Sequence, residues 1–149
     1  MQSIRPPRVC SRRGMTLIEM SVVITILLTL VSVLFIGAQS WKRGSDRAAC
    51  IVTQRNIQVA VRSYQNLYGY SPGGRPYADY GTQDIARHLF EKGYIESALY
   101  ELASGQKTCY GNGTYQRPGA DVFPLPGALY AQCSLSVSAN HAPTNSSDW

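Results

Sequence analysis

The sequence predicts an α+β protein in which one long N-terminal helix carries a small C-terminal head. Three observations support this class. An apolar segment without charge runs from Met20 to Ala38, apolar residues then recur with the period of a helix, and short strand-like segments between Gly and Pro residues fill the last third of the chain. With 149 residues the chain has room for one domain.

Positive charge is concentrated at the N-terminus. From Met15 onward ten basic and nine acidic side chains nearly balance, and the other four basic residues come first, at Arg5, Arg8, Arg12 and Arg13. A nucleic-acid surface needs a sustained basic patch to displace counterions from phosphates. We therefore expect no nucleic-acid binding by the body of the chain.

The segment from Met20 to Ala38 has the length and composition of a membrane-spanning helix. It contains no charge and no Pro, and as a helix it crosses a hydrocarbon core of about 30 Å. The alternative is a secretory signal peptide cut after Ala38. Because the apolar core of such a peptide is only about 7 to 15 residues long, and because Glu19 lies at the start of this segment, a retained helix is favoured.

Glu19 is an acid at the edge of this apolar segment, where burial costs up to about 3 kcal/mol near the bilayer centre. Its carboxylate can reach the lipid headgroups, become protonated or find a partner. Gly14, at the border between the basic and apolar segments, offers a protease an accessible, extended bond. Cleavage there would create an α-amine on Met15 that can neutralise Glu19, within one helix or between neighbours.

The string RRGMTLIEMSVVITILLTLVSVL, residues 12–34, resembles the class III leader and N-terminal helix of type IV pilins and type II secretion pseudopilins. This resemblance implies that a prepilin peptidase cleaves after Gly14, that the new N-terminal residue Met15 is N-methylated, and that Glu19 is the charge used in assembly. Many family members have a Pro about twenty residues into the mature helix. This chain has no Pro between Met15 and Tyr70.

The resemblance also implies a domain organisation: a cleaved leader (1–14), a transmembrane and assembly helix (15–41) and a pilin-like periplasmic head (42–149) that includes the amphipathic continuation of the helix. Such a protein is a single-pass protein of the bacterial inner membrane, and its filament lies in the periplasm or at the cell surface. The implied partners are copies of itself and related pilins or pseudopilins, the prepilin peptidase, the inner-membrane assembly platform and membrane lipid.

We therefore expect a structural subunit of a type IV pilus-like or type II secretion pseudopilus filament, and not an enzyme. Two alternatives stay open. One is a minor tip pilin whose head is a binding module, and the other is a small secreted protein with an ordinary signal peptide. Type II secretion, surface pili and DNA uptake all use subunits of this plan.

The helix is predicted to continue beyond the membrane as an amphipathic helix that ends near Gly69. One face is expected to carry the apolar residues Cys50, Ile57, Val61, Tyr64 and Tyr68, and the other faces Gln54, Arg55, Gln58, Arg62 and Gln65. In the head we predict a helix capped by Thr82 that runs through Glu91 to Gly93, and another over 96–102. Strands over 113–116 and 128–135 are expected to form an antiparallel pair.

Three cysteines remain once the leader, which contains Cys10, is removed. We predict a disulfide between Cys109 and Cys133, which would close a loop of about 25 residues and contribute about 3 kcal/mol. Cys50 is either a small buried apolar residue on the inner face of the helix or the partner of one of the other two.

We expect no cofactor and no metal centre. His88 and His141 do not lie within metal-ligand spacing of a Cys, Asp or Glu cluster along the sequence, and His88 one turn after Asp84 indicates an exposed helix pair. The Gly-rich string CYGNGTY lacks the Lys of a phosphate loop and is predicted to be a turn. The polar residues 140–149 are expected to be mobile.

Overall fold

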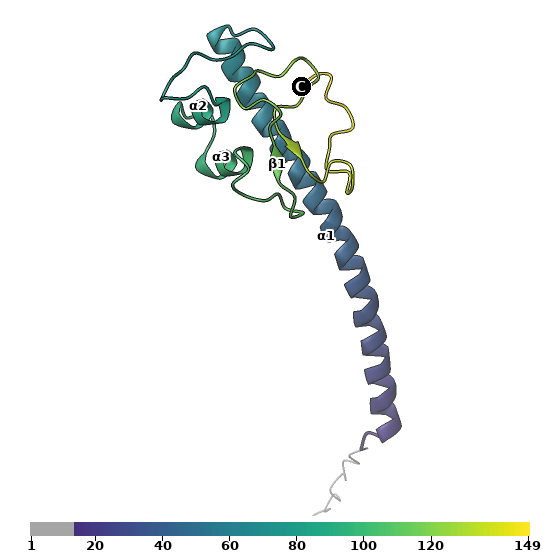
Figure 1. The fold of residues 1–149 in the computed structure, drawn as a ribbon. Helices are drawn as coiled ribbons and strands as arrows, with labels where there is room; N and C mark the ends of the chain where they lie inside the picture. The colour runs from purple at the N-terminus through teal and green to yellow at the C-terminus, as the bar shows by residue number, and fades with distance from the viewer. Residues whose placement is uncertain (1–13) are drawn as a thin grey trace, which may run out of the picture. The chain divides into compact units, whose positions relative to one another are not determined.

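The computed structural model describes residues 14–149, and the chain divides into two units, one ending at Ser40 and one running from Trp41 to Trp149. Residues 1–13 of the expected leader, with Cys10 and the four arginines, lie outside the described residues. The helix α1 (Leu17–Tyr68) supplies all the regular structure of the first unit and continues into the second (Figure 1). The expected long N-terminal helix is confirmed.

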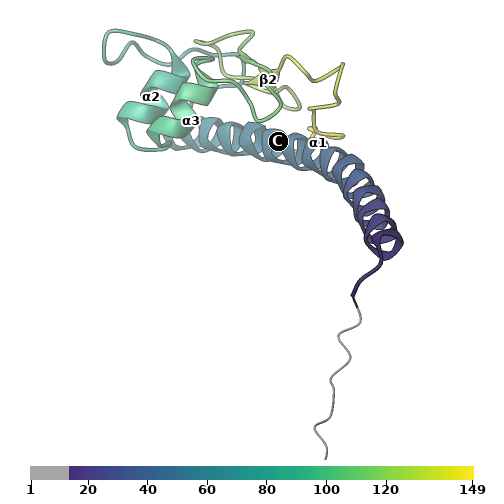
Figure 2. The ribbon, with the colours of Figure 1, turned by 90° about the horizontal axis from the view of Figure 1, so that it is seen from below.

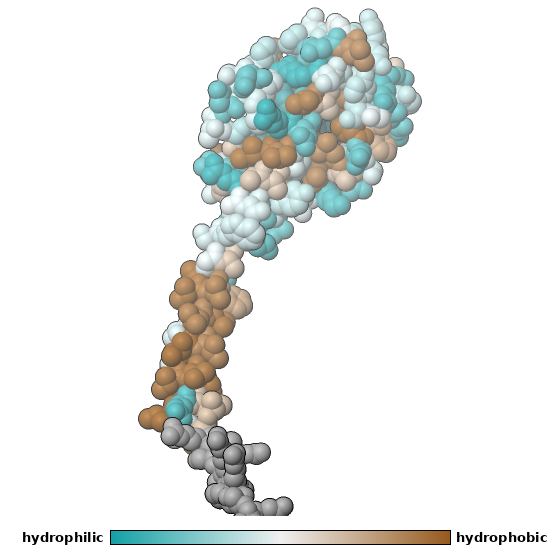
Figure 3. Space-filling model, turned by 180° about the vertical axis from the view of Figure 1, so that it is seen from behind, coloured by the Kyte–Doolittle hydropathy of each residue, from teal (hydrophilic) through white to brown (hydrophobic). Residues whose placement is uncertain are grey.

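In the first unit the apolar part of α1 has no protein cover. Every described side chain up to Ser40 is exposed; Leu17, for example, keeps 88% and Ile36 74% of its surface. On the face seen in Figure 3, most of this part of the molecule is hydrophobic, and one hydrophilic patch lies near its N-terminal end. Since an apolar surface of this kind is unfavourable in water, it requires lipid or other protein around it. Among the described residues, α1 is the one helix long and apolar enough to cross a membrane.

The second unit is a small α+β head. Its elements after α1 are α2 (Ile85–Glu91), α3 (Ser97–Ala103), β1 (Tyr115–Gln116) and β2 (Gln132–Cys133). The helices α2 and α3 lie next to each other along α1, and the two strands pair antiparallel with Tyr115 opposite Cys133 (Figure 2). This arrangement confirms the α+β, pilin-like class.

The main core of the head lies where α1 meets α2 and the C-terminal coil. It contains three residues of α1 (Ile57, Val61 and Tyr64), three of α2 (Ile85, Ala86 and Leu89), and Ile95, Ala103, Phe123, Tyr130 and Ala131. The α1 residues recur at helical spacing on one face, as expected. Tyr68, predicted on the same face, is 48% exposed because α1 ends there and Gly69 turns the chain away with φ 68°.

The prediction that Gln54, Gln58 and Gln65 lie on other faces of the helix is wrong. All three are buried, and each amide bonds a backbone group of another segment. Gln58 is the clearest example: its Nε2 donates to the Ala128 carbonyl at 3.0 Å, and its Oε1 accepts from the Tyr130 N–H at 2.8 Å. The C-terminal coil makes few hydrogen bonds of the kind that join strands, so side-chain amides bond its buried backbone N–H and C=O groups instead.

The two short helices begin later than expected. The carboxylate of Asp84, not Thr82, caps α2 by accepting from the Ala86 N–H at 2.9 Å. Thr82 instead forms an isolated bridge with Asp79. The end of α2 is as predicted, because Gly93 follows it with φ 75°.

Both strands are much shorter than predicted. Each holds two residues of the expected segments, Tyr115–Gln116 and Gln132–Cys133. Between them the chain contains three prolines, which cannot donate to a ladder. Arg62 of α1 holds this coil through its guanidinium, which donates to the carbonyls of Pro124 at 2.7 Å and Leu125 at 2.8 Å.

Candidate functional site

The segment before α1 is accessible. Residues 14–16 are exposed and not helical, and a Cβ added to Gly14 would meet no atom within 4 Å. Met15 keeps 76% of its surface exposed. The Gly14–Met15 peptide bond, predicted as the prepilin peptidase site, therefore lies in an open stretch that a protease can bind in extended form.

Glu19 forms a capping box with Thr16. The Thr16 backbone N–H donates to Glu19 Oε2 at 2.8 Å, the Thr16 hydroxyl donates to the same oxygen at 2.9 Å, and the Glu19 N–H donates to Thr16 Oγ1 at 3.4 Å. These bonds satisfy two N–H groups that the first turn of a helix leaves without partners. They explain why α1 begins at Leu17. The string Thr-x-x-Glu at residues 16–19 is the signal in the sequence from which this cap was predictable.

The hydroxyl groups of the apolar segment are satisfied within its own helix. Each donates to a backbone carbonyl three or four residues earlier at 2.8 to 2.9 Å; these residues are Ser21, Thr25, Thr29 and Ser32. At 100° per residue the four lie within about 80° of one another around the helix. The segment thus has one face of small side chains and no hydroxyl that needs an outside partner.

A second cluster lies in the head, where the sequence predicted no metal-ligand set. It consists of Cys50 on α1, Cys109 in a turn, Cys133 on β2 and His141 in the C-terminal coil. One ligand atom from each lies within 4.8 Å of the others, and all four side chains are buried. His141 is only 4% exposed, so the expectation that residues 140–149 are mobile does not hold for this residue.

Hydrogen-bond donors point at the sulfur atoms of this cluster. The Tyr115 hydroxyl donates to Cys50 Sγ at 3.3 Å, and the Gly113 N–H donates to Cys109 Sγ at 3.3 Å. Burial raises the pKa of the Cys133 thiol to about 12, and the backbone N–H of Leu135 opposes that increase. The predicted turn over CYGNGTY is confirmed, and it brings Gly113 against Cys109.

The Cys109 and Cys133 sulfurs lie 3.5 Å apart, beyond the length of about 2.05 Å of a disulfide bond. All three described cysteines are free thiols in the structure, so the Cys109–Cys133 bond stays a prediction about the oxidised protein. Cys50 is fully buried beside them and lies within reach of either sulfur.

His88, predicted as half of an exposed helix pair, is fully buried. Its Nδ1 lies 3.3 Å from the Tyr64 hydroxyl, and its Nε2 lies 2.9 Å from the Thr82 carbonyl. Burial also raises the pKa of Tyr64 above its ordinary value. Asp84 pairs instead with Arg117, whose Nη1 donates to Asp84 Oδ1 at 2.6 Å. This network joins α1, α2 and the coil and has a structural role.

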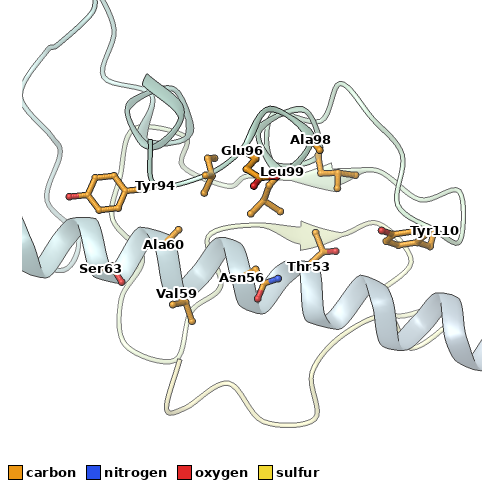
Figure 4. Close-up of a pocket in the computed structure, with 12 residues that line it drawn as sticks. Thr53, Asn56, Val59, Ala60, Ser63, Tyr94, Glu96, Ala98, Leu99 and Tyr110 are labelled. Atoms are coloured by element: carbon orange, nitrogen blue, oxygen red, sulfur yellow. The ribbon is translucent and has the colours of Figure 1, made fainter. Parts of the chain in front are cut away.

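A shallow groove of about 580 Å³ runs between α1 and the start of α3 (Figure 4). Its lining includes Asn56 and Val59 of α1 and Leu99 of α3, with Tyr110 at one end. Glu96 is the single charged side chain among the described residues that line it. Its described lining residues thus include one carboxylate and no histidine, and no pair of carboxylates for acid–base chemistry.

Comparison with known proteins supports the N-terminal site. The prokaryotic N-terminal methylation motif matches residues 10–35. The chain thus carries the class III leader of type IV pilins and pseudopilins, a leader that marks substrates of prepilin peptidase and subunits that assemble into filaments with other pilins. No curated protein and no solved structure matches the chain at a significant level.

Proposed function

We propose that this protein is a structural subunit of a type IV pilus-like or type II secretion pseudopilus filament. The observation that carries the proposal is the methylation motif placed on an exposed apolar helix, directly after an accessible Gly14–Met15 bond. Prepilin peptidase cleaves this bond, Met15 is then N-methylated, and the helix holds the subunit in the inner membrane with its head in the periplasm until assembly.

The capping box supports a role for Glu19 in assembly. Only Oε2 of this carboxylate accepts hydrogen bonds among the described residues, all of them from Thr16. Oε1 is left to accept from the positive amine that cleavage creates on Met15. In a filament the amine of a neighbouring subunit neutralises the carboxylate and sets the register between the two helices.

The surface of the apolar segment supports packing against copies of the same helix. Small residues on one face let helix backbones approach closely, and in lipid this close packing drives helix association. The face formed by Ser21, Thr25, Thr29 and Ser32 has this character. Assembly would then bury the exposed apolar side chains among neighbouring subunits.

The test of processing is the N-terminal sequence of the mature protein from membranes of cells that contain a prepilin peptidase. We expect it to begin with N-methylated Met15. Gly14→Val should block cleavage, whereas the matched control Gly37→Val should not. An added Cβ meets no atom within 4 Å at either position, so a difference between the two variants reports recognition by the peptidase and not a clash within the chain. A mature chain that begins near Gln39 would instead support an ordinary signal peptide.

The test of assembly is the amount of the protein in sheared filaments. Glu19→Gln should be cleaved normally but recovered in filaments in much lower amount, because the charge partner of Met15 is lost. Glu96→Gln, the same change at an exposed acid of the head, is the control and should assemble. Normal filaments from Glu19→Gln would refute the charge pair. A wild-type chain found only in trace amounts at filament ends would support the tip-pilin alternative.

A further inference from the structure

We propose that Cys50, Cys109, Cys133 and His141 form a tetrahedral site for one zinc-type divalent cation in the head. The proposal rests on this cluster alone and is independent of filament assembly. Its four ligand atoms lie within 4.8 Å of one another, although the residues come from four separate segments of the head.

The spacing of the ligand atoms matches that of a tetrahedral zinc site. Zinc binds sulfur at about 2.3 Å and imidazole nitrogen at about 2.0 Å, so two sulfurs on one zinc lie about 3.8 Å apart. Cys109 Sγ lies 3.5 Å from Cys133 Sγ and 3.9 Å from His141 Nδ1. Metal binding therefore requires only small side-chain movements.

The donor set selects the class of metal. Three sulfurs and one imidazole suit Zn²⁺, whereas Ca²⁺ and Mg²⁺ require oxygen ligands. No carboxylate belongs to the cluster among the described residues. On binding, the three thiols each release a proton to water, and the resulting thiolates with one Zn²⁺ carry a net charge of −1.

Groups around the cluster can stabilise the net negative charge of the metal–thiolate centre and orient its ligands. Donors from Tyr115 and the Gly113 backbone already point at sulfur, as around metal thiolates. Gln54 Nε2 donates to the His141 carbonyl at 2.8 Å and so fixes the segment that carries the histidine. On the outer side, His141 borders a pocket of about 550 Å³ that is also lined by Lys42, Arg43 and Asp46. This pocket places two positive side chains and one carboxylate near His141.

Two glycines let the turn approach the cluster. A Cβ on Gly113 would lie 3.0 Å from Cys133 Sγ, and one on Gly111 would lie 2.5 Å from His141 Cε1. Only residues without a side chain fit at these positions, so the turn is shaped around the cysteines and the histidine.

A disulfide between Cys109 and Cys133 is the competing outcome, since an oxidising compartment favours it and it uses two of the same sulfurs. A disulfide, however, leaves the Cys50 sulfur and the His141 imidazole buried beside it and outside the bond. The metal site uses all four side chains and joins α1 to β2, the turn and the C-terminal coil.

The experiment uses the full chain in detergent, reduced and freed of metal, titrated with Co²⁺ as a spectroscopic probe. We expect one Co²⁺ per chain, with the absorption bands of tetrahedral cobalt and sulfur-to-cobalt charge transfer, and displacement by Zn²⁺. Cys50→Ser and His141→Gln should each weaken binding at least tenfold. Tyr110→Phe, an exposed change next to Cys109, is the matched control and should bind like the wild type.

X-ray absorption of the zinc-loaded wild type keeps the test independent of how the variants fold. It should show three sulfurs at about 2.3 Å and one nitrogen at about 2.0 Å. The proposal is overturned by a shell of oxygens, by the absence of stoichiometric Co²⁺ binding, or by binding that Cys50→Ser and His141→Gln leave unchanged. It is also overturned if protein isolated without reductant from zinc-supplied cells holds a Cys109–Cys133 disulfide and no metal.

Discussion

Replacing Gln58 with Ala should lower the free energy of unfolding of the head far more than the few atoms removed from the side chain suggest. The Gln58 amide is 1% exposed and holds two backbone groups, the Ala128 carbonyl at 3.0 Å and the Tyr130 N–H at 2.8 Å. Its removal loses two hydrogen bonds at about 1 kcal/mol each and leaves the buried Tyr130 N–H without an acceptor. We expect a loss of about 2 to 3 kcal/mol, which lowers the melting temperature of a head of this size by about 10 °C.

The assay is thermal unfolding of the full chain in detergent, followed by the near-ultraviolet circular dichroism of its tyrosines. Asn66→Ala is the matched control, because it deletes an exposed amide from the same helix. Hydrogen exchange should show faster exchange of the Tyr130 amide in Gln58→Ala alone. Equal melting temperatures for the two variants would refute the bridging role of Gln58.

Two further predictions concern the head. Lys92 Nζ donates to Asp79 Oδ2 at 2.7 Å, and this bond lowers the pKa of Asp79. Asp79→Asn should therefore reduce stability at neutral pH. Its difference from the wild type in chemical denaturation should shrink as the pH falls below the ordinary Asp pKa of about 4, because the unfolded chain takes up the proton there and the folded chain does so only at lower pH; a constant difference would contradict this. Gly113→Ala should cost about 1 to 3 kcal/mol, because its Cβ would lie 2.8 Å from Leu135 Cγ. The control Gly44→Ala has open space around its Cβ and lies within α1, where Ala favours the helix, so it should melt at or slightly above the wild-type temperature. Equal melting of both variants would argue against the close contact at Gly113.

The sequence predicted α1 and its core face because both depend on local pattern. An unbroken apolar segment and the spacing of Ile57, Val61 and Tyr64 are properties of one helix, and the structure reproduces them. The burial of Gln58 was not predictable from the same pattern. Its environment is set by the backbone of residues 128–130, which is distant in the sequence, and a polar side chain is normally assigned to solvent.

The cysteine and histidine cluster was missed for a related reason. Metal-ligand signatures in sequences rely on pairs a few residues apart, as in Cys-x-x-Cys. Here Cys50 and His141 approach each other only because the C-terminal coil packs back on α1, where Gln54 binds the His141 carbonyl. The signal available in the sequence was the presence of three cysteines after Gly14, an odd number that one disulfide cannot use completely.

The hydrogen bonds of the hydroxyl groups in the apolar segment affect how easily this helix can move from lipid into the interior of a protein assembly. Each is already bonded to a carbonyl of its own helix, from Ser21 through Ser32. A rod built in this way can leave lipid and enter a protein interior without exchanging any of these bonds with water or lipid. In the proposed filament, the Glu19 carboxylate in the first turn is then the one side chain of the described helix up to Ala38 that requires a new polar partner.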